Sequence, residues 1–195
     1  MSGNFEGIKT QKFGVEVECT GLTRSAAAKA VAKVIGGSTE HFGGNYDRYD
    51  VYDGRNRLWK IMSDGSIRCT NKNGNPASKF CSIELVTPIL EYEDMATLQE
   101  VIRSIRRSGG VCNESTEIHI HIEFTSYDVQ KLRNLVNIFA SKEDMLYRAL
   151  QVYNVNYIGN AGYPQIVTEE LWNTVQNKKN TSGYSRRYSQ SRSAI

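Results

Sequence analysis

The sequence predicts an α+β fold, in which a largely antiparallel sheet carries helices on one face and an acidic, histidine-bearing face on the other. Three observations predict it: short segments that alternate between apolar and polar residues, helical periodicity between those segments, and turn residues that join neighbouring strands as hairpins. Successive side chains of a strand point to opposite faces, so such a sheet has one apolar and one polar side. We expect the chemistry on the polar side.

The clearest alternation lies in residues 117–124, which read Glu-Ile-His-Ile-His-Ile-Glu-Phe. The isoleucines point to one side of a strand, and His119 and His121 point to the other together with the two glutamates. We expect the isoleucines to join an apolar core. Two imidazoles between two carboxylates are more than solubility requires, which makes the opposite face a candidate site.

Two other segments repeat this pattern. Residues 13–19 place Glu16 and Glu18 on one face of a strand, and residues 80–86 place Ser82 and Glu84 on one face of another. If the three strands share a sheet, their carboxylates and histidines gather on one side of it.

Helices are expected where apolar residues recur with helical spacing and capping residues flank them. Thr23 or Ser25 can cap the first helix, and Gly36-Gly37 ends it. Asp64-Gly65 signals a tight turn between two strands. The predicted helices cover 24–35, 94–107, 126–150 and 168–178; the predicted strands cover 12–19, 48–53, 57–63, 66–70 and 79–87, besides the histidine strand; and loops cover 41–47 and 153–164.

The length and composition indicate one globular domain over 1–178, followed by a basic, flexible tail over 179–195. The chain has 195 residues, of which 39% are apolar and 23% charged. The net charge is +3, but residues 178–195 contribute +5, so the remainder is −2. No apolar run approaches the ~20 residues that span a bilayer.

The N-terminus lacks the basic start and apolar run of a secretory signal. The four cysteines are widely spaced and are expected to be reduced thiols, which predicts a cytoplasmic location without membrane contact.

The acidic residues of the polar face are suited to divalent metal. Two residues apart on one strand, Glu16 and Glu18 have Cβ atoms about 6.5 Å apart, which suits one or two ions. Glu84 offers a third carboxylate and His119 an imidazole. Oxygen ligands favour Mg²⁺ or Mn²⁺, and a zinc site is disfavoured because the only other histidine is His41, in a predicted loop. The alternative is three ordinary solvated strand faces.

The turn after the Trp59 segment is a second candidate. Trp59 is expected in the core, whereas a turn at the edge of a polar cleft would present Asp64 and Ser66 to a substrate. Lys60 and Arg68 are either surface cations or phosphate contacts.

Four segments in order, 13–18, 59–67, 84–90 and 118–122, resemble the amidoligase family, which belongs to the glutamine synthetase and glutamate–cysteine ligase superfamily. The resemblance covers about residues 12–150. It implies a fold like the glutamine synthetase catalytic domain and the ATP-dependent joining of a carboxylate to an amine through an acyl phosphate. By carry-over, Glu16, Glu18, Glu84 and His119 resemble metal ligands, His121 resembles the histidine nearer the nucleotide, and Arg186 resembles a phosphate contact.

Two departures from the family pattern stand out. Glu117 occupies a place where the family usually has glycine, and it would either repel phosphate or act as an extra ligand. Residues 151–195 contain no later strand with a glutamate and an arginine, so we expect a shortened site, or one completed by a second copy in a homo-oligomer.

The leading hypothesis is therefore an amidoligase that uses ATP and Mg²⁺ or Mn²⁺ to act on a peptide, protein or amino acid, with Asp64, Ser66 and Glu84 in catalytic roles. The alternative is a non-catalytic module of the same fold that binds nucleotide and metal or a protein partner. Nucleic-acid binding by the tail is a third hypothesis, disfavoured because the rest of the chain is slightly acidic.

Overall fold

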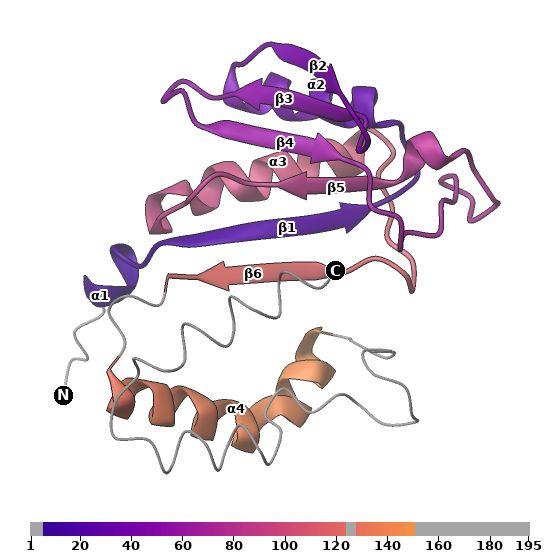
Figure 1. Cartoon of the computed structure of the whole chain (residues 1–195). Helices are drawn as coiled ribbons and strands as arrows, with labels where there is room; N and C mark the ends of the chain where they lie inside the picture. Colours follow the sequence, from indigo (N-terminus) through magenta and orange to yellow (C-terminus); the bar gives the residue numbers. More distant parts are fainter. Residues whose placement is uncertain (1–5, 124–127, 151–195) are drawn as a thin grey trace. The chain divides into compact units, whose positions relative to one another are not determined.

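The computed structural model describes residues 6–123 and 128–150 (Figure 1). Contacts divide the chain into two units, residues 1–123 and residues 124–195. The first unit contains a six-stranded antiparallel sheet together with helices, which confirms the predicted α+β class.

The sheet has the strand order β2-β3-β4-β5-β1-β6, and every neighbouring pair is antiparallel. The first strand of the chain therefore lies between the last two, and β6 lies at one edge (Figure 1). The strand bounds are β1 Phe13–Cys19, β2 Thr39–Gly43, β3 Arg48–Tyr52, β4 Leu58–Met62, β5 Ile83–Val86 and β6 Ile118–Ile122.

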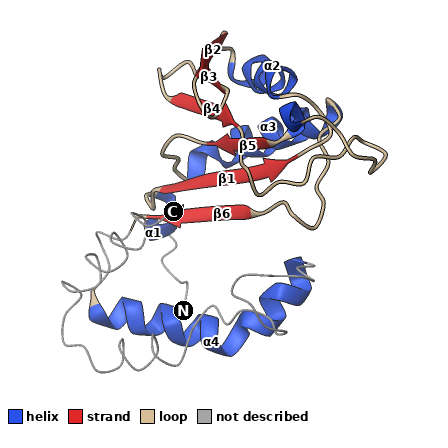
Figure 2. Cartoon of the chain, turned by 45° about the vertical axis from the view of Figure 1, so that its right-hand side comes forward, coloured by secondary structure: helices blue, strands red, loops and turns tan. Residues whose placement is uncertain are grey.

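Helices α2 (Arg24–Ile35) and α3 (Met95–Arg107) lie on the same side of the sheet (Figure 2). The alanine-rich α2 allows close approach, and the buried Ser104 hydroxyl of α3 donates a hydrogen bond to the Ala30 carbonyl of α2 at 2.8 Å. The core that they enclose contains Ala27, Ala28, Val31, Val51, Trp59, Ile61, Ile83, Leu85, Leu98, Val101 and Ile105. Trp59 is fully buried, as expected from the sequence.

The ends of α2 follow the predicted capping chemistry. The Thr23 side chain accepts a hydrogen bond from the Ala26 amide, and Gly36 closes the helix in the left-handed conformation at φ 76°. In α3, Asp94 occupies the N-cap position, close to the predicted start.

The remaining helical elements are short or lie outside the sheet unit. They are α1 (Glu6–Lys9), the 3-10 turns Lys79–Cys81 and Tyr92–Asp94, and α4 (Val129–Leu150) of the second unit. Leu132 and Val136 of α4 are buried. The segments predicted at 153–164, 168–178 and 179–195 lie outside the described residues.

No helix in the described part of the chain is long and apolar enough to cross a membrane. The four cysteines are free thiols, as predicted.

Three strand predictions need correction. Residues 66–70 form no strand, and the predicted hairpin at Asp64-Gly65 is wrong because β4 pairs with β3 and β5 instead. The strand predicted over 79–87 begins only at Ile83, after a 3-10 turn. Strand β2 enters the predicted loop 41–47 and places His41 within the sheet.

The isoleucine side of β6 was also predicted wrongly. Ile118, Ile120 and Ile122 are 67%, 65% and 53% exposed, not part of the core. The physical reason is the position of β6 at the edge of the sheet. Helices α2 and α3 form the core with β1, β3, β4 and β5 instead.

A buried arginine fixes the segment that leads into β5. Arg24 is only 3% exposed, and its guanidinium donates hydrogen bonds to the carbonyls of Lys79 at 3.0 Å and Ser82 at 2.8 Å. It also forms an ion pair with Asp47 at 2.6 Å, which lowers the pKa of that carboxyl group mainly through the Arg24 hydrogen bond. Arg24 thus holds the approach to Glu84 in place.

Replacing this arginine with an unbranched apolar residue tests whether it holds the segment before β5 in place. We expect Arg24→Met to lower the free energy of unfolding by roughly 2–4 kcal/mol, because it removes the donor to the buried Ser82 carbonyl and the ion-pair partner of Asp47. Urea unfolding of this variant, compared with Arg106→Met at an exposed position of α3, measures the effect. Equal stability of the two variants would contradict the assigned role.

Candidate functional site

The register of β1 with its two neighbours brings the predicted polar residues together. Glu18 lies directly opposite Glu84 of β5. On the other side of β1, Glu16 lies opposite His119 of β6, and Gly14 lies opposite His121. These side chains share the sheet face opposite the core, which we call the polar face.

Three carboxylates form the tightest group on this face. Oxygen atoms of Glu18, Asp64 and Glu84 all lie within 4.8 Å of one another, and we call these residues the carboxylate cluster. Glu18 is almost fully buried at 5% exposure, whereas the other two are half-buried.

Asp64 reaches the cluster because Ser82, the residue before β5, holds the loop after β4. The Asp64 amide donates a hydrogen bond to the Ser82 hydroxyl oxygen at 2.9 Å, and that hydroxyl donates to the Asp64 carbonyl at 2.5 Å. The Ser66 amide donates to the Asp64 carboxylate at 2.6 Å, and the Ser66 hydroxyl donates to the same oxygen. The exposed Ser66 therefore supports Asp64 in this structure.

Beside the cluster lies a second group, the histidine network of Glu16, Glu117, His119 and His121. Glu16 contacts both imidazoles, with His119 Nδ1 at 3.0 Å and His121 Nε2 at 3.1 Å. The other ring nitrogen of His119 lies 3.0 Å from the Glu117 carboxylate. Both nitrogens of His119 therefore face carboxylate oxygens.

A backbone hydrogen bond links the two groups. The Glu117 amide donates to Glu18 Oε2 at 3.0 Å, while the Glu18 amide donates to the Glu117 carbonyl at the same distance. The start of β6 thus orients a buried carboxylate of the cluster.

Burial and repulsion between carboxylates shift the pKa values of Glu84 and Glu18 in the cluster. Burial, followed by the negative charges of Glu16, Asp64 and Glu18, raises the pKa of Glu84 to about 7. Burial also raises the pKa of Glu18, although the hydrogen bond from the Glu117 amide opposes that shift. A divalent cation would relieve this repulsion.

The histidine network favours a positive charge on His119. The hydrogen bond with Glu117, reinforced by Glu16, raises the pKa of His119 against the opposing effect of burial. As an imidazolium, His119 donates from both ring nitrogens to the two carboxylates.

Most of the residues selected from the sequence lie together. Glu16, Glu18, Asp64, Glu84, His119 and His121 all belong to the two groups described above. Arg186 lies outside the described residues. Arg68 pairs with Glu114 on an exposed loop, and His41 pairs with Asp47 at 2.7 Å on β2.

Ser82 and Lys60 also belong to the site. Ser82 was expected beside Glu84, but its contacts with Asp64 are ones that no local pattern reveals. Lys60, expected as either a surface cation or a phosphate contact, pairs with Val86 of β5, which in turn pairs with Glu16, so Lys60 shares the polar face.

The donor atoms of the cluster suit a divalent metal ion. Carboxylate oxygens are the ligands that Mg²⁺ and Mn²⁺ prefer, and three converging oxygens supply half of an octahedral shell. His119 contributes to metal binding only by giving up one of its two carboxylate contacts.

Comparison with protein families gives one result. The family model described as "Putative amidoligase enzyme" matches residues 9–192. No curated protein and no solved structure matches significantly.

The raised pKa of Glu84 predicts that the free energy of unfolding depends on pH. Between its ordinary value of 4.5 and its folded value of about 7, the folded state binds a proton that the unfolded state has released. Without divalent metal, we therefore expect the free energy of unfolding to fall by roughly 1–3 kcal/mol across this range as the pH rises.

Urea midpoints at several pH values measure this loss. Glu84→Gln should flatten the slope, and Glu100→Gln, at a half-buried position of α3 away from the polar face, should leave it unchanged. A slope that persists in Glu84→Gln would show that other groups cause it.

Proposed function

Because the chain belongs to the family of amidoligase enzymes, we propose that it joins a carboxylate to an amine at the expense of ATP, with divalent metal bound at the carboxylate cluster. The observation that carries the proposal is the convergence of Glu18, Asp64 and Glu84 from three separate segments. Three carboxylates that repel one another are stable together mainly when a cation joins them.

Glu18, Asp64 and Glu84 would hold a first ion, and Glu16, with His119 or Glu117, offers ligands for a second. The ions, Mg²⁺ or Mn²⁺, would neutralise charge on the phosphates during transfer. The fit rests on the three oxygens within 4.8 Å of one another and on the burial, together with the repulsion between carboxylates, that raises the pKa of Glu84.

The proposed reaction has two steps. A carboxylate oxygen of the substrate attacks the γ-phosphorus of ATP, which forms an acyl phosphate and releases ADP. The amine nitrogen of the second substrate then attacks the acyl carbon, inorganic phosphate leaves, and the amine loses a proton to a carboxylate of the polar face.

Other residues of the polar face would position the substrates. His121 lies beside Glu16 and is suited to contact phosphate, and Lys60 offers a cation on the same face. In this arrangement Ser66 acts through Asp64, because its amide and hydroxyl both donate to that carboxylate. Arg186 remains a proposed phosphate contact.

For the carboxylate and the amine, we propose a peptide, protein or amino-acid substrate. The free thiols suit a reducing compartment, which supports a cytoplasmic location.

One observation favours the non-catalytic alternative. The Glu117 carboxylate lies 3.0 Å from His119 Nε2, so this ring nitrogen is already engaged, and the carboxylate adds negative charge where phosphate would bind. A module that binds metal without turning over ATP would tolerate this residue. ATP binding without ADP release, across a panel of amines and carboxylates, would favour the module over the enzyme.

Calorimetric titration of the chain with a non-hydrolysable ATP analogue and Mg²⁺ tests nucleotide binding. We expect metal-dependent binding that weakens by more than about tenfold, or ~1.4 kcal/mol, in Glu18→Gln/Glu84→Gln. Glu100→Gln on α3 is the matched control and should bind normally. Absence of binding to the native chain, or equal binding to the double variant, would contradict the proposal.

A further inference from the structure

Strand β6 offers one row of backbone groups that no strand of the described residues pairs with, because β6 has only β1 as a neighbour. Glu117 and Glu123 exchange backbone hydrogen bonds with the β1 side, through the amide of Glu18 and the carbonyl of Lys12. Backbone direction alternates along a strand, so the amides and carbonyls of Ile118, Ile120 and Ile122 point away from β1.

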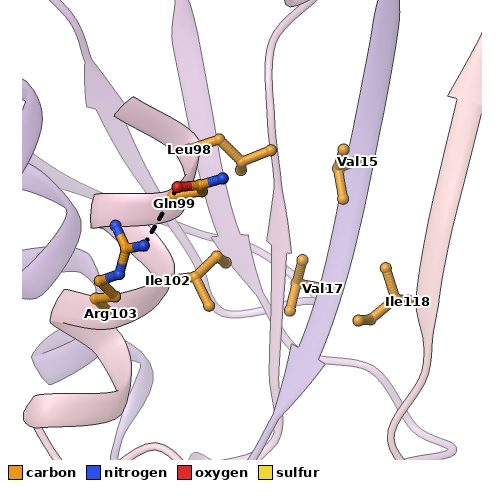
Figure 3. Close-up of a pocket in the computed structure, with 7 residues that line it drawn as sticks. All are labelled: Val15, Val17, Leu98, Gln99, Ile102, Arg103 and Ile118. Carbon is orange, nitrogen blue, oxygen red and sulfur yellow. Dashed lines mark hydrogen bonds between the residues drawn. The ribbon is translucent and has the colours of Figure 1, made fainter. Parts of the chain in front are cut away.

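The same three isoleucines expose their side chains on the core side of the sheet. They are 67%, 65% and 53% exposed, and Ile118 also borders a shallow apolar groove between β1 and α3. Figure 3 shows Val15 and Val17 of β1 facing Leu98 and Ile102 of α3 across this groove, with Ile118 beside them. An unpaired edge that also exposes a row of isoleucines is a surface that proteins normally cover.

The sequence of β6 is complementary to itself. Residues 117–123 read Glu-Ile-His-Ile-His-Ile-Glu in either direction, so two antiparallel copies can match apolar with apolar residues and polar with polar residues. Several registers match apolar with apolar and polar with polar residues, and the charges that they place opposite one another distinguish between them. Pairing centred on Ile120 sets Glu117 opposite Glu123 of the partner subunit, which makes two pairs of like charge. Pairing centred on His119 sets Glu117 opposite His121 of the partner subunit, which makes two pairs of opposite character, and leaves one like pair, His119 opposite His119 of the partner subunit.

We propose that a second copy of this chain pairs with β6 in an antiparallel arrangement centred on His119. In this register Ile118 exchanges backbone hydrogen bonds with Ile120 of the partner subunit, and Ile120 does so with Ile118 of the partner subunit. The two sheets become continuous, and the exposed isoleucines of both copies form one apolar surface. Each subunit contributes Glu117 and His119 beside the histidine network of the other, so the polar face is shared.

The oligomeric state of the full chain tests the pairing. Light scattering coupled to gel filtration, over a concentration series, should show the mass rising from 22.0 kDa to about twice that value. Ile120→Pro should remain monomeric, since it removes an amide that points away from β1 and leaves the β1–β6 hydrogen bonds intact. Ile120→Val, which keeps this amide, should dimerise like the native chain.

Circular dichroism and thermal melting establish that Ile120→Pro is folded. A native chain that stays at 22.0 kDa at all concentrations, or a folded Ile120→Pro that still dimerises, would overturn the proposal.

Crosslinking tests the register without relying on the proline variant. His119 would face His119 of the partner subunit at a non-hydrogen-bonded position, where Cα atoms lie about 4.5 Å apart and a disulfide fits. In a Cys112→Ser background, His119→Cys treated with diamide should therefore form a covalent dimer on a denaturing gel.

His121→Cys is the matched control, because His121 faces Glu117 of the partner subunit in this register and should crosslink at least tenfold less. Equal crosslinking of the two variants, or none with His119→Cys, would overturn the proposed register.

Discussion

The pairing of β1 with β5 on one side and β6 on the other is the constraint on which the site depends. Only this register sets Glu18 opposite Glu84 and Glu16 opposite His119. A slip of one residue would turn both glutamates of β1 into the core and expose its apolar side chains. Core packing therefore specifies the site indirectly, because burying Val15 and Cys19 directs the intervening glutamates to the polar face.

That arrangement concentrates negative charge where the protein gains little stability from it. Glu18 is buried, and the pKa of Glu84 rises to about 7 through burial and repulsion. The hydrogen bonds of Ser82 hold Asp64 in the same cluster. Carboxylates held together against repulsion are typical of sites whose charge is completed by a ligand. The family match is to putative amidoligase enzymes, and the cluster supports our proposal that divalent cations assist the ligation.

Alternation in the sequence was sufficient to predict the three strands of the site and the face that each glutamate or histidine occupies. Alternation failed to predict features that depend on contacts between residues far apart in the sequence. Asp64-Gly65 has the local chemistry of a hairpin, yet Ser82, the residue before β5, holds this loop and residues 66–70 form no strand. The isoleucines of β6 have a core-like pattern, but local sequence does not reveal that their strand lies at the sheet edge. The role of Glu117 likewise depends on β6 pairing beside Glu18.

The most direct test of the account is a crystal structure grown with Mn²⁺ and a non-hydrolysable ATP analogue, with data collected at the manganese absorption edge. The account predicts an anomalous peak coordinated by oxygens of Glu18, Asp64 and Glu84, with the phosphates of the analogue on the same face. A bound analogue with no manganese at these three carboxylates would contradict it.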